Sequence, residues 1–165
     1  MEKIKTIGDA YLAAAGLIHQ TNNPTLDAVR CGLAMIRAAE RLPAAWQLRV
    51  GIHTGPVVAG VDHRQKYQYD IWGDTVNNAA RMESQAQSGT LFVNADTWRI
   101  IEPHCNGQSL GHRDIKSKGQ QEVFRIDSAK TSWNSRKRDL RSPHQNENKS
   151  KFTAIVQELI HMKRR

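Results

Sequence analysis

The sequence is poor in the features that build membrane-spanning or disulfide-linked proteins. Its longest apolar stretch, 10–18, is about half of the roughly 20 residues that a spanning helix needs. Only Cys31 and Cys105 are cysteines, too few for a disulfide scaffold, so both are expected to be free thiols in a reducing compartment. The N-terminus has no basic segment followed by an apolar one, so no secretory signal is expected. The cytoplasm is the expected location, whether as a free protein or as the cytoplasmic part of a larger, possibly membrane-attached one.

Acidic residues are few compared with basic ones, but this imbalance is concentrated at one end. The chain has 24 Lys and Arg against 16 Asp and Glu, a formal charge of +8. Residues 1–126 contain 14 basic and 12 acidic side chains, whereas residues 127–165 contain 10 and 4. We expect 127–165 to be a basic, largely disordered tail. A patch that binds nucleic acid or an anionic membrane surface is the alternative.

The apolar pattern of residues 1–126 predicts a single α+β domain. Period-two and β-branched runs predict strands at 3–7, 11–17, 48–52, 57–61, 67–72, 91–93, 111–115 and 122–126. Helical spacing and cap signals predict helices at 24–42, 75–87 and 95–102. The first two strands should form a hairpin with its turn near Gly8, and the runs at 48–52 and 57–61 should form one bent strand or a second hairpin. Within the tail, 152–162 has the spacing of a short amphipathic helix.

Five motifs occur in a fixed order along residues 1–126. They are KIKTIGDAY (3–11), GIHTG (51–55), YDIWGDTVN (69–77), ARME (80–83) and IKSKG (115–119). In this order and spacing they resemble the catalytic domain of the class III nucleotidyl cyclases. The resemblance implies a ferredoxin-like α+β sandwich. It also implies that a nucleoside triphosphate is cyclised by attack of its ribose 3′-hydroxyl on the α-phosphate, at a site shared by two domains and holding two Mg²⁺ or Mn²⁺ ions.

The resemblance assigns Asp9 to the metal site, as the second of two metal-binding aspartates. A carboxylate suits a hard divalent cation that prefers oxygen ligands. Taken alone, an Asp after Gly8 is also what a turn favours, so the metal role rests on the motif.

Lys5 and Asp70 match the pair that reads the nucleotide base. Adenine has an acceptor at N1 and a donor at its 6-amino group, so lysine can donate to the first and aspartate can accept from the second. Guanylyl cyclases resemble this pattern but have an acidic residue in place of Lys5 and usually a small one in place of Asp70. ATP is therefore the expected substrate. Without the motif, both residues would be read as solvated surface charges.

Asn77 and Arg81 match the ribose-orienting Asn and the transition-state Arg. They are four residues apart and therefore share one face of the predicted helix. A planar guanidinium suits the charge that builds on the α-phosphate oxygens. Lys116 matches a lysine that binds the terminal phosphates, and Ser117 replaces the usual Gly after it. His53, Asp74 and Glu83 are expected to be only a bend residue, a helix N-cap and a helix-surface residue.

The family's first strand, with a Phe-x-Asp-Ile motif carrying the other metal aspartate, has no match in residues 1–126. The sequence therefore predicts an N-terminally truncated domain that lacks its first strand and first helices and leaves strand edges unpaired. The expected activity is that of an adenylate cyclase, converting ATP to cyclic AMP and pyrophosphate, as a homodimer with two equivalent sites. The alternative is a catalytically silent module for nucleotide binding or dimerisation, and the chain by itself is expected to be inactive because one carboxylate holds two metals poorly.

Overall fold

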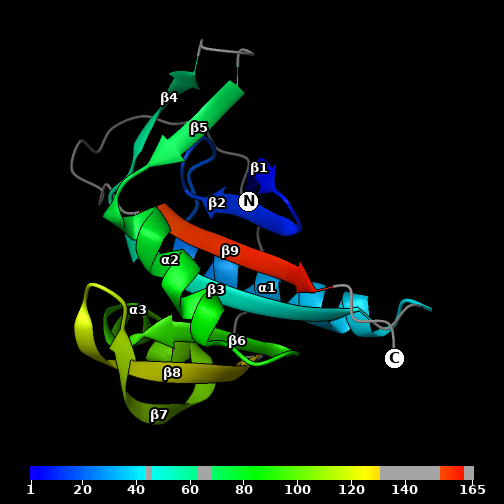
Figure 1. The fold of residues 1–165 in the computed structure, drawn as a ribbon, viewed down its shortest axis with the longest axis vertical. Helices are drawn as coiled ribbons and strands as arrows, with labels where there is room; N and C mark the ends of the chain where they lie inside the picture. Colours follow the sequence, from blue (N-terminus) through cyan, green and yellow to red (C-terminus); the bar gives the residue numbers. More distant parts are fainter. Residues whose placement is uncertain (44–45, 63–67, 131–152, 162–165) are drawn as a thin grey trace.

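The structure, a computed structural model, describes residues 1–43, 46–62, 68–130 and 153–161 (Figure 1). In chain order its elements are β1 (Glu2–Ile7), β2 (Ala10–Ala15), α1 (Pro24–Glu40), β3 (Gln47–Gly55), β4 (Val58–Asp62), β5 (Gln68–Trp72), α2 (Asp74–Gln85), β6 (Thr90–Asn94), α3 (Ala95–Ile101), a 3-10 turn (Glu102–His104), β7 (Cys105–Ile115), β8 (Gly119–Ala129) and β9 (Thr153–His161). The predicted hairpin and the three predicted helices are confirmed, with ends shifted by a few residues. The class is α+β, as expected.

Seven strands form one mixed sheet in the order β1-β2-β9-β3-β6-β8-β7, and β4 and β5 form a separate two-stranded ribbon. Helices α1 and α2 cover opposite faces of the sheet at β3. Val50 and Ile52 belong to the core cluster that α1 helps to form, whereas the intervening Gly51 lies against α2. Because successive strand residues point to opposite faces, this alternation places one helix on each side. Figure 1 shows α2 in front of the sheet and α1 behind it.

The C-terminal strand β9 lies in the interior of the sheet. It pairs antiparallel with β2 over 10–15 and with β3 over 47–55, so β2 and β3 are parallel and β9 fills the space between them. The prediction of a helix at 152–162 is therefore wrong for 153–161. Its apolar spacing fits a helix, but two open strand edges offer this β-branched segment backbone hydrogen bonds on both sides. The expected unpaired edges are also absent between β2 and β3. Residues 127–129 of the predicted tail are the last residues of β8, and residues 131–152 and 162–165 lie outside the described residues.

The expectation that 48–52 and 57–61 form one bent strand or a hairpin is also wrong. β3 ends at Gly55, and β4 pairs antiparallel with β5, from Val58 opposite Trp72 to Asp62 opposite Gln68. The two segments therefore form neither one bent strand nor a hairpin with each other. Pro56 stands between them, and a proline cannot donate a ladder hydrogen bond, which favours a break at this point. The ribbon that results carries Asp70 to a position beside β1.

Candidate functional site

The structure brings Lys5 and Asp70 together from two different sheets. Lys5 Nζ on β1 donates a hydrogen bond to Asp70 Oδ2 on β5 at 2.6 Å. Their side chains are 26% and 13% exposed, so the pair is partly shielded from solvent. Asp70 Oδ1 also accepts a hydrogen bond from the backbone amide of Ile71 at 2.8 Å. A cationic donor and an anionic acceptor thus stand next to each other in a partly buried position.

Helix α2 presents Asn77 and Arg81 on one face, one turn apart. Asn77 is exposed, and the Nε of Arg81 is buried without a hydrogen-bond partner among the described residues. The helix follows Gly73, whose φ of +134° is a conformation that L side chains rarely adopt. Gly73 is the N-cap residue, so the expectation that Asp74 caps this helix is wrong; Asp74 is the first helical residue.

Lys116 is exposed in the turn between β7 and β8. The amide of Lys118 donates to the carbonyl of Ile115 at 2.8 Å, which closes a four-residue turn. Ser117, at the third position of this turn, has a φ of +63°, a value that favours glycine. The turn therefore adopts a positive φ although the residue is a serine. Lys118 Nζ lies 2.6 Å from Asp74 Oδ2, which joins this turn to the first turn of α2.

His53 is buried in a polar network that the sequence did not predict. Its Nδ1 donates to Asn94 Oδ1 at 3.0 Å, and its Nε2 accepts from Asn78 Nδ2 at 3.3 Å, an arrangement that requires the neutral ring. Burial lowers the pKa of His53, which favours the same neutral form. The bend role expected for His53 is therefore incomplete, because its side chain links β3 to β6 and α2.

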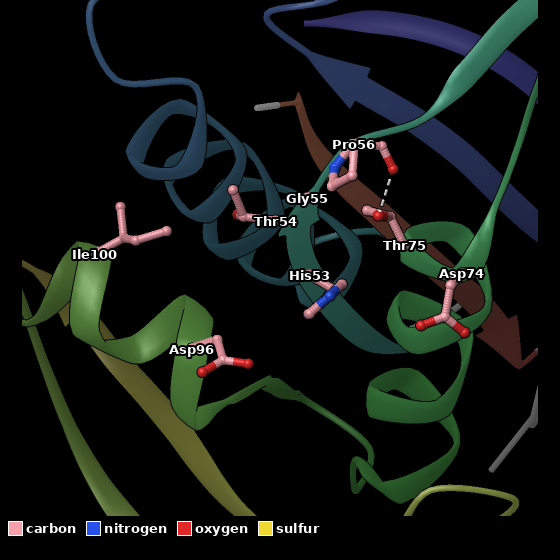
Figure 2. A pocket seen from close by; sticks show the side chains of 8 residues that line it. All are labelled: His53, Thr54, Gly55, Pro56, Asp74, Thr75, Asp96 and Ile100. Atoms are coloured by element: carbon pink, nitrogen blue, oxygen red, sulfur yellow. Dashed lines mark hydrogen bonds between the residues drawn. The ribbon is translucent and has the colours of Figure 1, made fainter. Parts of the chain in front are cut away.

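His53 and Asp74 also border a pocket of about 470 Å³ at the C-terminal end of β3. Figure 2 shows its lining residues on β3, α2 and α3, with the hydroxyl of Thr75 donating to the carbonyl of Pro56. That bond is 2.6 Å long and ties the first turn of α2 to the chain just after β3. The pocket therefore lies directly beside the helix that carries Asn77 and Arg81.

Glu83 is buried, so the expectation that it is a surface residue of α2 is wrong. It is 5% exposed and forms an ion pair with Arg49 of β3, with 2.9 Å between Oε1 and the Arg49 Nε. The helix can lie this close because Gly51 has no side chain: a Cβ there would come within 2.0 Å of the Glu83 amide nitrogen. The GIHTG motif therefore serves packing at Gly51 and the polar network at His53.

Asp9 lies in the exposed turn between β1 and β2, immediately before Ala10. Pairing of β2 with β9 begins at Ala10, opposite Leu159, so the turn directly precedes the paired part of β2. Among the described residues no group of three or more His, Cys, Asp or Glu side chains could hold a metal ion. The described residues therefore do not by themselves fit a complete two-metal site.

Taken together, these observations describe an α+β domain with a seven-stranded mixed sheet and a pocket beside α2. The sequence of residues 1–128 matches the family described as the adenylate and guanylate cyclase catalytic domain. The chain belongs to this family. Within the part of the chain that the structure describes, no helix is long and apolar enough to cross a bilayer.

This chain is similar both to proteins named adenylate cyclases and to proteins named guanylyl cyclases. The germination-specific adenylate cyclase of Dictyostelium discoideum is 36% identical over 154 residues, covering 85% of this chain and 17% of that protein. Retinal guanylyl cyclase 2 of Rattus norvegicus is 36% identical over 134 residues, covering 74% of this chain and 12% of that protein. The chain thus spans less than a fifth of the length of these two relatives.

Solved structures give the same assignment. The guanylate cyclase domain of RhGC from Catenaria anguillulae, in complex with GTP, has a TM-score of 0.75 and 30% identity, covering 78% of this chain and 73% of that one. The catalytic core of a rhodopsin-guanylyl cyclase with converted specificity, in complex with ATPαS, has a TM-score of 0.74 and 32% identity, covering 78% and 72%. Family and fold are therefore established, whereas the choice between ATP and GTP is not.

Proposed function

We propose that this domain is an adenylate cyclase that forms cyclic AMP and pyrophosphate from ATP. The observation that carries the proposal is the contact between Lys5 and Asp70, which stand 2.6 Å apart although they come from different sheets. A lysine donor beside an aspartate acceptor complements N1 and the 6-amino group of adenine. Guanine presents a donor at N1 and an acceptor at O6, so it would place like groups against each other.

The base-reading pair has to rearrange when a nucleotide binds. In the structure the Lys5 ammonium donates to the Asp70 carboxylate. A bound base must instead accept a hydrogen bond from Lys5 and donate one to Asp70. Asp70 keeps a second hydrogen bond, from the backbone amide of Ile71, which holds its carboxylate in place during the exchange. The partial burial of both side chains strengthens each new bond relative to one in open water.

The remaining residues of the site act on the ribose and the phosphates. Asn77 is proposed to orient the ribose so that its 3′-oxygen faces the α-phosphorus. That oxygen then forms a bond to phosphorus while the bond to pyrophosphate breaks, and the hydroxyl proton passes to solvent water. Arg81 would donate from its guanidinium group to the phosphate oxygens as charge builds on them. Lys116, exposed in its turn, would hold the terminal phosphates.

A divalent metal needs several ligands, and the described residues of a single subunit do not provide such a cluster. The family uses divalent metals, and Asp9 is the ligand we propose from this chain, but no step is assigned to a metal held by its described residues alone. We propose a homodimer, in which Asp9 of one subunit faces the base- and ribose-binding residues of the other. The proposed compartment is the cytoplasm, or the cytoplasmic side of a larger protein.

Product analysis tests the substrate assignment. The chain, in its natural full-length context, is incubated with ATP or GTP and either Mg²⁺ or Mn²⁺, and both cyclic nucleotides are quantified by mass spectrometry. We expect cyclic AMP to dominate, and the double variant Lys5→Glu with Asp70→Cys to shift the ratio toward cyclic GMP. Lys3→Glu is the matched control, because it makes the same charge change on β1 without touching Asp70. A wild-type preference for GTP would refute the assignment.

The second candidate is a catalytically silent module that binds nucleotide or dimerises. It is favoured by one observation, the absence among the described residues of a cluster that could hold a metal. Turnover of ATP separates the two candidates, and calorimetry with a non-hydrolysable ATP analogue shows in parallel whether nucleotide binds. A silent module binds the analogue but forms no cyclic nucleotide, even at high Mn²⁺ and high protein concentration. Turnover under those conditions would exclude it.

A further inference from the structure

The ion pair between Asp74 and Lys118 joins two parts of the site that are 44 residues apart in the sequence. Lys118 Nζ lies 2.6 Å from Asp74 Oδ2, and this contact lowers the pKa of the Asp74 carboxyl. Asp74 begins α2, the helix that carries Asn77 and Arg81. Lys118 ends the turn that carries Lys116. The pair therefore sets where the phosphate-binding lysine lies relative to the helix.

A polar network supports the Asp74 side of this contact. Asn78 Nδ2 donates to Asp74 Oδ2 at 3.2 Å and also to His53 Nε2 at 3.3 Å. His53 in turn donates to Asn94, which caps α3 by accepting from the amide of Thr97 at 3.2 Å. Hydrogen bonds thus run from α3 through β3 and α2 to the turn at 116–118. Asp74 Oδ2 thus accepts from Asn78 and from Lys118 at the same time.

On the assumption of the function proposed above, we propose that Asp74 and Lys118 are positioning residues for the phosphate end of the site. Their ion pair keeps the turn at 116–118 against the first turn of α2, so that Lys116 and Arg81 face the same triphosphate. Lys118 itself is then a partner of Asp74 rather than a phosphate ligand. Its side chain is 29% exposed, compared with 63% for Asp74, so most of the lysine stem is covered in this arrangement.

Binding of inorganic tripolyphosphate tests this role without depending on the base or on turnover. We expect Asp74→Asn and Lys118→Met each to weaken calorimetric affinity three- to fivefold, the size expected when an exposed ion pair is lost. The charge-reversed double variant, Asp74→Lys with Lys118→Asp, should restore affinity to within about twofold of the wild type. Asp96→Asn is the matched control, because it removes an ion pair of equal length, to Arg99, beside the same pocket.

Limited trypsin digestion reports on the turn itself. Cleavage after Lys116 should be faster in Asp74→Asn than in the wild type, unchanged in Asp96→Asn and slow again in the reversed pair. If Lys118 were a phosphate ligand, Asp74→Asn would leave affinity unchanged or raise it and the reversed pair would lose binding, which overturns the proposal. A wild type that does not bind tripolyphosphate overturns it as well. Preference for GTP over ATP would refute only the substrate assignment.

Discussion

Lys5 and Asp70 are 65 residues apart in the sequence, yet Lys5 Nζ donates to Asp70 Oδ2 across 2.6 Å. The contact ties the edge strand β1 to the ribbon of β4 and β5, which is otherwise outside the seven-stranded sheet. The pair is thus at once a structural link between two sheets and the proposed reader of the base. If the pair binds a base, the direct contact between Lys5 and Asp70 that links the two sheets has to weaken.

The first prediction concerns the energy of this pair. Lys5→Met leaves the Asp70 carboxylate, 13% exposed, without its cation, and should lower the free energy of unfolding by about 1–2 kcal/mol. Asp70→Asn should cost a similar amount, and the double variant should cost less than the sum of the two. Urea denaturation of all four proteins measures the coupling. Strict additivity would show that the contact contributes nothing in solution.

The second prediction concerns Gly51. An alanine Cβ there would lie 2.0 Å from the Glu83 nitrogen and 2.4 Å from the Ala79 oxygen, both backbone atoms that cannot move without shifting α2. We expect Gly51→Ala to destabilise the domain by about 3 kcal/mol or more, or to prevent folding. Gly60→Ala is the control, because its nearest contact is the Trp72 side chain at 3.5 Å, and it should change stability by less than about 1 kcal/mol. Equal melting temperatures for the two variants would contradict this packing.

The third prediction is a pH dependence that arises from His53. Burial lowers its pKa below the ordinary 6.5, so as the pH falls below about 6.5 the unfolded chain takes up a proton before the folded one does. Stability should therefore decline on acidification and be fully present above that pH. The charges that face the ring are Asp74 and Asp96, which raise its pKa, and Lys118, which lowers it.

The prediction is tested by measuring the free energy of unfolding of the wild type and of His53→Gln between about pH 5 and 8, a range that spans the ordinary pKa of histidine. The slope below pH 6.5 should be smaller in the variant. An NMR titration showing His53 protonated at or above its ordinary pKa would disprove the neutral network.

The fourth prediction concerns β9. Removing residues 153–165 would leave the facing edges of β2 and β3 unpaired, so we expect loss of cooperative unfolding and self-association. Val156→Pro should act similarly, because Val156 pairs with Ala13 on one side and Ile52 on the other, and proline cannot serve in an inner strand. Circular dichroism and size-exclusion chromatography report both effects; a stable, monodisperse truncation would contradict the pairing.

The fifth prediction tests the shared site of the proposed homodimer. Asp9→Ala and Arg81→Ala, each made in the natural full-length protein, should be inactive alone. When they are mixed and allowed to exchange subunits, one of the two sites in each heterodimer contains both intact residues, so part of the activity should return. Exchange is verified independently with differently tagged subunits. Exchange without recovered activity would show that these residues do not meet across a subunit interface.

The sequence by itself determined the elements whose signals are local. The hairpin around Gly8, the helix after Pro24 and the strand-helix unit at 68–85 follow from periodicity and turn chemistry. The motifs also predicted residues that the structure brings together, because Lys5 and Asp70 form one pair and Asn77 and Arg81 share one helix face. Family membership likewise follows from the order of these motifs.

Only the tertiary structure decided what depends on partners far away in the chain. The apolar spacing at 153–161 is compatible with a helix, and the two open edges of β2 and β3 made it a strand. Likewise, Glu83 is buried because Gly51 admits the helix backbone, and Asp74 is a link to Lys118 because the β7–β8 turn comes beside α2. Hydrogen-bond and charge partners of this kind leave no periodic trace in the sequence, since they depend on the space between elements rather than on neighbours along the chain.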